Sequence, residues 1–147
     1  MRSNPNEHKQ RRGAAVVEFA LVSALLFLLL FGIIEVGLLL GDQALVGAAA
    51  REAVRAAAAG SPVGTSASVG VAAGVGLHLS SANIALEKSA DGGGVWVPLG
   101  DTALGTNDAV SGTLVRATAT YSHPLVTTYI FSGSARLLTA KLVMQRE

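Results

Sequence analysis

The sequence predicts an α+β fold in which a long N-terminal helix packs on a small antiparallel sheet. Three segments lead to this prediction. Residues 14–40 are almost wholly apolar, residues 42–59 are rich in alanine and favour helix, and residues 113–121 alternate apolar with polar side chains as a half-buried strand does. The helix-forming segments come first along the chain and the strand follows them.

The apolar run from Ala14 to Leu40 predicts a transmembrane helix over residues 14–41. Its only charged residues are Glu18 and Glu35, and at about 1.5 Å per residue it spans roughly 40 Å as a helix. A bilayer core needs about 20 apolar residues, whereas the apolar core of a signal peptide has about 7 to 15. The composition agrees, because only 14% of the residues are charged.

Basic residues just before the run predict its orientation. Residues 1–13 form a polar leader that contains Arg2, Lys9, Arg11 and Arg12. Positive charge next to a span stays on the cytoplasmic side. The N-terminus is therefore expected in the cytoplasm, and residues 42–147 are expected to form one extracytoplasmic domain on a single-pass anchor.

Within that domain the helix is expected to continue to about residue 59 and to stop at Gly60-Ser61-Pro62. Its buried stripe is expected to contain Ala44, Val46, Ala50 and Val54. The other predicted elements are a second helix from Thr65 or Ser66 to about Leu79, strands at 83–88, 113–121 and 137–146, and a turn at 91–94. Pro124 is expected to end the strand that begins at 113, and the last strand is expected to pair with it.

The residues give no support for catalysis or for a cofactor. The net charge is +1, which does not favour a nucleic-acid partner, and the chain has no cysteine. His8, His78 and His123 have no metal-binding spacing, and Gly74-Val75-Gly76 lacks the third glycine of a dinucleotide loop. No enzyme, metal or cofactor is expected.

Three short motifs carry a resemblance to a known family. They are Gly13–Phe19 (GAAVVEF) at the start of the apolar run, Gly32–Gly37 (GIIEVG) within it, and Arg51–Arg55 (REAVR) after it. Over residues 11–55 the chain resembles the TadE-like family, the minor pseudopilins of tight-adherence (Flp-type) pilus systems. That family often has proline where this chain has Ala24, so a straighter helix is expected here.

The resemblance implies a non-enzymatic, pilin-like component of a tight-adherence pilus or secretion system that serves adhesion. It implies cleavage after Gly13 by a prepilin peptidase, which leaves Ala14 as the new N-terminus. It also implies that Glu18, which Phe19 follows, neutralises the N-terminal amine of a neighbouring subunit. The expected partners are the lipid bilayer, the peptidase, other pilin or pseudopilin subunits and the assembly machinery, and the expected location is the cell membrane or the pilus itself.

Several roles stay open on the residues alone. Glu18 also fits the first turn of a helix, where the dipole stabilises a carboxylate. Glu35 fits either a pairing with a partner's base or an interfacial position that faces headgroups and water. Gly37 and Gly41 form a small-xxx-small pair that permits close helix packing. The alternative to the pilus component is an ordinary single-pass membrane protein whose external domain binds another ligand.

Overall fold

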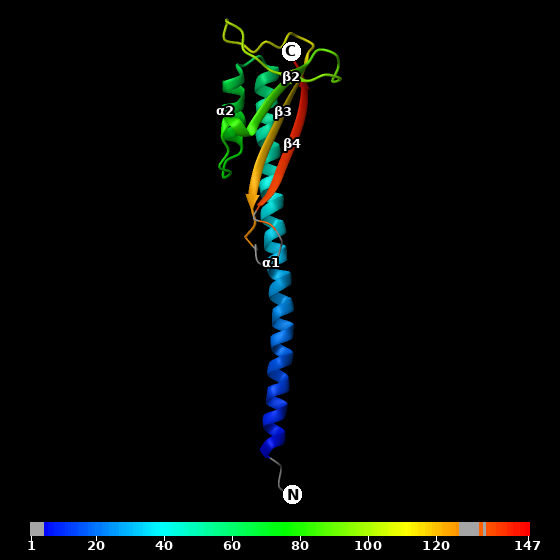
Figure 1. The fold of residues 1–147 in the computed structure, drawn as a ribbon. Coiled ribbons are helices and arrows are strands. Elements are labelled where there is room, and N and C mark those ends of the chain that lie inside the picture. Colours follow the sequence, from blue (N-terminus) through cyan, green and yellow to red (C-terminus); the bar gives the residue numbers. More distant parts are fainter. Residues whose placement is uncertain (1–4, 127–132, 134) are drawn as a thin grey trace. The chain divides into compact units, whose positions relative to one another are not determined.

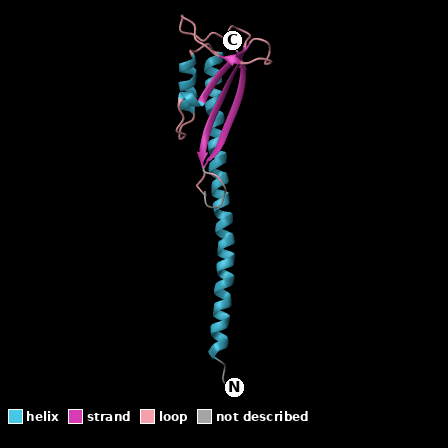
Figure 2. Ribbon diagram, viewed as in Figure 1, coloured by secondary structure: helices cyan, strands magenta, loops and turns pink. Residues whose placement is uncertain are grey.

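The computed structural model describes residues 5–126, 133 and 135–147. Its helices are α1 (Pro5–Ala58) and α2 (Val63–Ala73), with a 3₁₀ turn η1 (Ser81–Asn83). Its strands are β1 (Ile84–Ser89), β2 (Val97–Pro98), β3 (Leu114–Pro124) and β4 (Ala135–Gln145) (Figure 2). The long N-terminal helix and the four-stranded antiparallel sheet confirm the predicted α+β class.

The chain divides into two compact units, Met1–Gly37 and Leu38–Glu147. In the first unit the helix begins at Pro5 and therefore includes residues 5–12, which the sequence suggested as a polar leader. The apolar side chains of this unit are exposed all round the helix, from 74% for Phe19 to 43% for Phe31. A helix that exposes apolar side chains on every face suits an apolar solvent.

In the second unit the strand order is β2-β1-β3-β4, and every pairing is antiparallel. β3 pairs with β1 on one side and with β4 on the other, so that Ala119 lies opposite both Ile84 of β1 and Ala140 of β4. The predicted alternation is confirmed, because Val115, Ala117 and Ala119 are buried while the intervening side chains are only half-buried. β3 ends at Pro124 as predicted and pairs with β4 as expected.

The core of the second unit lies between the sheet and the second half of α1, with α2 beside both (Figure 1). The buried face of α1 consists of Val46, Ala49, Ala50, Ala53, Val54 and Ala57. The expected stripe was right for Val46, Ala50 and Val54 and wrong for Ala44, which is exposed. Ala44 lies on the opposite side of the helix from Val46, because two residues correspond to a rotation of about 200°.

The α2 helix packs unusually close to α1 at Gly70. A Cβ atom at this position would lie 2.8 Å from the carbonyl oxygen of Ala49, 2.8 Å from Cβ of Ala53 and 2.6 Å from Cδ1 of Ile84. α2 also starts earlier than predicted, at Val63, and ends at Ala73 rather than near Leu79. Asp101, distant in the sequence, accepts a hydrogen bond from the Val63 N–H at 2.7 Å and so completes the helix start.

Substitution of Gly70 by alanine tests this close packing. We expect Gly70→Ala to lower the free energy of unfolding by about 1 to 3 kcal/mol, because neither the Ala49 carbonyl nor the Ala53 methyl group has space to retreat. Gly64→Ala in the same helix is the matched control, since its Cβ would meet nothing within 4 Å. That variant should leave stability unchanged or raise it by up to about 1 kcal/mol through helix propensity.

The measurement is urea unfolding of the full chain in detergent micelles, followed by the fluorescence of Trp96, the single tryptophan. Trp96 reports on the fold because the Arg116 guanidinium stacks on its ring at 4.1 Å. Equal stabilities of the two variants would contradict the proposed packing.

Candidate functional site

The candidate processing site lies inside α1. Gly13 and Ala14 are both helical, and a Cβ at Gly13 would meet nothing within 4 Å. A peptidase has to bind the scissile backbone in an extended form, so the helix must unwind locally at this bond. Glycine lowers the cost of unwinding, because it is about 1 kcal/mol less favourable than alanine within a helix.

The carboxylate of Glu18 lies one helical turn after Ala14. Both Glu18 and Phe19 are exposed on α1, and the residues on either side of this pair are apolar. The segment from Ala14 to Leu40 contains no Lys, Arg or His. A cation that neutralises Glu18 must therefore come from outside this segment.

The other acidic residue of the apolar run, Glu35, is only 4% exposed, although its neighbours Ile34 and Val36 are 44% and 55% exposed. Gly37 and Gly41 behave differently, because both are exposed and a Cβ at either would meet nothing within 4 Å. Because neither residue has a side chain, another helix can approach α1 closely at these two positions.

The second half of α1 is held at both of its ends, by the sheet near its beginning and by residues outside the strands at its end, through contacts that the sequence did not reveal. Near its beginning, Nδ1 of His123 at the end of β3 lies 2.7 Å from Oδ2 of Asp42. The neighbouring Gln43 donates a hydrogen bond to the carbonyl oxygen of Thr139 in β4. His123 and Asp42 are 81 residues apart, so no local pattern in the sequence could have paired them.

At the other end of α1, side chains satisfy the last carbonyl groups of the helix. The Asn107 amide donates to the carbonyl oxygens of Ala57 at 2.7 Å and Ser61 at 2.8 Å. The Arg146 guanidinium donates to the Ala58 carbonyl at 3.1 Å. Carbonyl groups at a helix end lack partners within the helix, and a cation there also suits the negative end of the helix dipole.

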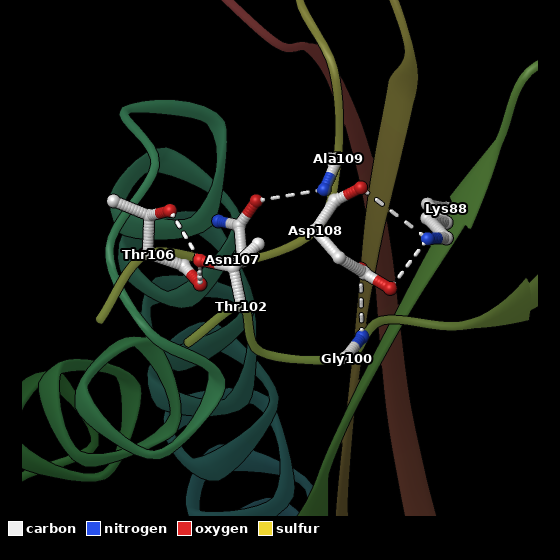
Figure 3. Close-up of polar contacts among 7 residues, drawn as sticks. All are labelled: Lys88, Gly100, Thr102, Thr106, Asn107, Asp108 and Ala109. Atoms are coloured by element: carbon white, nitrogen blue, oxygen red, sulfur yellow. Dashed lines mark hydrogen bonds and ion pairs between the residues drawn. The ribbon is translucent and has the colours of Figure 1, made fainter. Parts of the chain in front are cut away.

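The loop that carries Asn107 is held by polar contacts of its own (Figure 3). Lys88 of β1 lies 2.6 Å from the carboxylate of Asp108, which also accepts the N–H of Gly100 at 2.8 Å. Across the loop, the N–H of Thr102 bonds to the carbonyl oxygen of Thr106 at 2.8 Å. These bonds fix the loop backbone so that Asn107 reaches the end of α1.

Hydrogen bonds to carboxylates lower two pKa values in this region. The hydrogen bond from Lys88 holds the pKa of Asp108 below its usual value of 3.8. Burial opposes this effect in part, and the Gly100 N–H adds a lesser lowering of the pKa. In the glycine turn at residues 91–94, the Ser89 hydroxyl and then the Val95 N–H lower the pKa of Asp91. These contacts join the two loops to the end of β1, because Lys88 and Ser89 are strand residues while Gly100 and Val95 lie in the loops.

Within the described part of the chain, no three His, Cys, Asp or Glu side chains gather as a metal site requires. Within the described residues, α1 is the helix long and apolar enough to cross a membrane, by length and composition, over Ala15–Ala58, and an 18-residue stretch of it has a mean hydropathy of 2.6. Fold and site together describe a small α+β domain built around the end of an apolar anchoring helix.

Comparison with known families agrees with the resemblance found in the sequence. Residues 13–55 match the model of the family described as TadE-like protein. The match begins at Gly13, continues through Glu18 and Glu35, and ends at Arg55, so it covers all three motifs. No curated protein and no solved structure matches the chain.

The ion pair of Lys88 and Asp108 predicts an acid-dependent loss of stability. A carboxyl group whose pKa is lowered on folding stabilises the protein above its unfolded pKa, here about 3.8, and that contribution is lost as the pH falls through the folded value. We expect Asp108→Asn to lower stability at pH 7 by at most about 1 kcal/mol, because the pair is partly exposed. Below about pH 4 its stability should fall less steeply than that of the unaltered protein.

Urea unfolding followed by Trp96 fluorescence at a series of pH values measures this effect. Lys88→Met is the matched control, because it keeps the carboxyl group and removes the largest cause of its lowered pKa. It should flatten the same part of the pH profile. A profile for Asp108→Asn that is parallel to that of the unaltered chain would contradict the assignment.

Proposed function

We propose that this protein is a membrane-anchored minor pilin, or pseudopilin, of a tight-adherence pilus or a related secretion system. Its role in this proposal is structural and not enzymatic. The observation that carries the proposal is the Gly13–Phe19 motif at the start of a membrane-length helix, within a segment that matches the TadE-like family. An anchor without an assembly role has no need of this motif.

The proposed topology follows from charge. Arg2, Lys9, Arg11 and Arg12 precede the apolar run and would hold the N-terminus in the cytoplasm. The second unit, Leu38–Glu147, would then lie outside the cytoplasmic membrane. In this position the α+β domain is available to other pilin subunits and to the assembly machinery.

Glu18 would provide the link between processing and assembly. Cleavage after Gly13 creates an ammonium group at Ala14, and a carboxylate at membrane depth is costly unless it is paired. No cation occurs between Ala14 and Leu40, so the amine of a neighbouring subunit is a suitable partner. The alternative, an ordinary single-pass protein, predicts neither cleavage nor a role for Glu18 beyond the first helical turn.

The first test concerns cleavage. In cells with an active prepilin peptidase, the mature chain should begin at Ala14, and Gly13→Val should leave it uncut, because a side chain there keeps the backbone from the catalytic carboxylates. Gly37→Val is the matched control, since it alters an exposed glycine of the same helix and should be cut normally. Mass spectrometry of the membrane-extracted protein gives the result.

An intact N-terminus in the unaltered protein, in a cell whose other prepilins are cut, would remove the main support for the pilin proposal. Cleavage of Gly13→Val at the normal rate would show that another bond is the site.

The second test concerns pairing. We expect Glu18→Gln to leave membrane insertion and cleavage intact and to impair assembly, because glutamine keeps the size of the side chain and removes its charge. Loss of one partner of a buried ion pair costs about 3 to 5 kcal/mol, whereas loss of a favourable dipole interaction costs about 0.3 to 1 kcal/mol. The readouts are co-purification with partner pilins and recovery of surface fibres.

Glu52→Gln is the control for this test. Glu52 pairs with Arg55 in the same helix at 2.6 Å, and the pair is exposed to solvent, so its loss should change little. Normal complexes and normal fibres from Glu18→Gln would leave Glu18 with only a helix-terminal role.

A further inference from the structure

β3 runs back along α1 toward the end of the apolar run. Its first residues lie near the C-terminus of α1, because Arg146 donates its N–H to Thr113 and its guanidinium to Ala58. Its last residues lie near Asp42, which contacts His123. The helix rises roughly 24 Å from Asp42 to Ala58. Ten residues of an extended strand cover roughly 33 Å, so β3 alone is long enough to run beside this whole part of α1.

The place where the sheet ends is also the place where the apolar run ends. Asp42 is the first charged residue after Glu35. The apolar residues Leu38–Leu40 come before it, and only Gly41 separates them from it. Leu39 packs against the core of the second unit. If α1 crosses a membrane, the end of β3 and the start of β4 therefore lie level with the membrane surface.

The side chains at this end of the sheet suit such a surface. We call residues 123–126 and 135–137 the proximal end of the sheet. Val126 is 65% exposed and Leu137 is 69% exposed, and Arg136, which lies opposite His123 in the pairing of β3 with β4, is also exposed. Val126 follows His123 by three residues, so it lies within about 10 Å of the contact with Asp42.

We propose that the proximal end of the sheet contacts the lipid bilayer as a second, shallow membrane attachment, in addition to α1. Val126 and Leu137 lie in the interfacial layer, and the Arg136 guanidinium binds lipid phosphate while its aliphatic stem lies among apolar groups. The proximal end lies beside Asp42, directly after the apolar residues Leu38–Leu40 of the same unit, and this position favours lipid over a separate protein as the occupant. The inference rests on the membrane anchoring in the proposed function.

Such an attachment restricts how the external domain rotates and tilts on the single helix. The contact between His123 and Asp42 holds the proximal end against the part of α1 that belongs to the same unit. A subunit that leaves the bilayer for a fibre has to release this contact or exchange it for one with a neighbouring subunit.

Because the chain has no cysteine, single-cysteine variants of the full protein test the proposal directly. Val126→Cys and Leu137→Cys carry an environment-sensitive fluorophore at the proximal end. Leu104→Cys is the aqueous control, since Leu104 is 91% exposed in the loop of residues 100–109, and Leu25→Cys in the apolar run is the membrane control. The proteins are reconstituted at low density in phosphatidylcholine vesicles that contain a minority of phosphatidylglycerol.

Two quenchers distinguish the environments: a lipid spin-labelled near its headgroup, and iodide in the water. We expect the labels at 126 and 137 to be quenched several-fold more strongly by the spin-labelled lipid than the label at 104. Iodide should quench position 104 well and positions 126 and 137 weakly. The label at 25 should be protected from iodide.

The other outcomes separate the two proposals. Labels at 126 and 137 that behave like the label at 104, with position 25 still protected, would overturn this inference and leave the anchor in place. Protection of 126 and 137 from both quenchers would indicate a protein surface and would also overturn it. Full access of iodide to position 25 would overturn the anchoring itself.

A charge variant tests the role of Arg136. Arg136→Gln should reduce the lipid quenching measured at position 126, whereas Lys141→Gln, at an exposed base further along β4, should not. Equal effects of the two substitutions would overturn the phosphate contact assigned to Arg136.

Discussion

One helix has to satisfy two environments, and the rest of the structure follows from this requirement. The part of α1 before Leu38 exposes apolar side chains on every face, which is favourable in lipid and costly in water. The part after Asp42 has one buried face and one exposed face that bears Arg51 and Arg55. The buried face contains four alanines and two valines, so it is nearly flat and lets the sheet and α2 approach closely.

Close packing of small side chains buries little area per residue, so polar contacts at the ends of the packed region gain importance. Asn107 and Arg146 satisfy the carbonyls where α1 ends, and His123 meets Asp42 where the packed part begins. Because buried polar groups are costly when unpaired, these contacts fix the register of the sheet along the helix. The ion pair of Lys88 and Asp108 extends this restraint to the loop that presents Asn107.

The two acidic residues Glu18 and Asp42 of α1 differ in where their partners come from. Glu18 is a carboxylate in a segment without cations, so a cation that pairs with it has to come from outside this segment, and in the proposed assembly that cation is the amine of a neighbouring subunit. Asp42, by contrast, finds its partner within the chain. Each of these acids lies near one end of the apolar run.

The sequence by itself determined the fold class, the long apolar helix, the paired strands that became β3 and β4, and the motifs at Gly13–Phe19. These features are local, because hydropathy, alternation and helix propensity act over neighbouring residues. Tertiary structure decided what depends on residues far apart: the start of α2 against Asp101 and the exposure of Ala44. It alone paired His123 with Asp42 and Asn107 with the end of α1, since such contacts arise only when the sheet folds back along the helix.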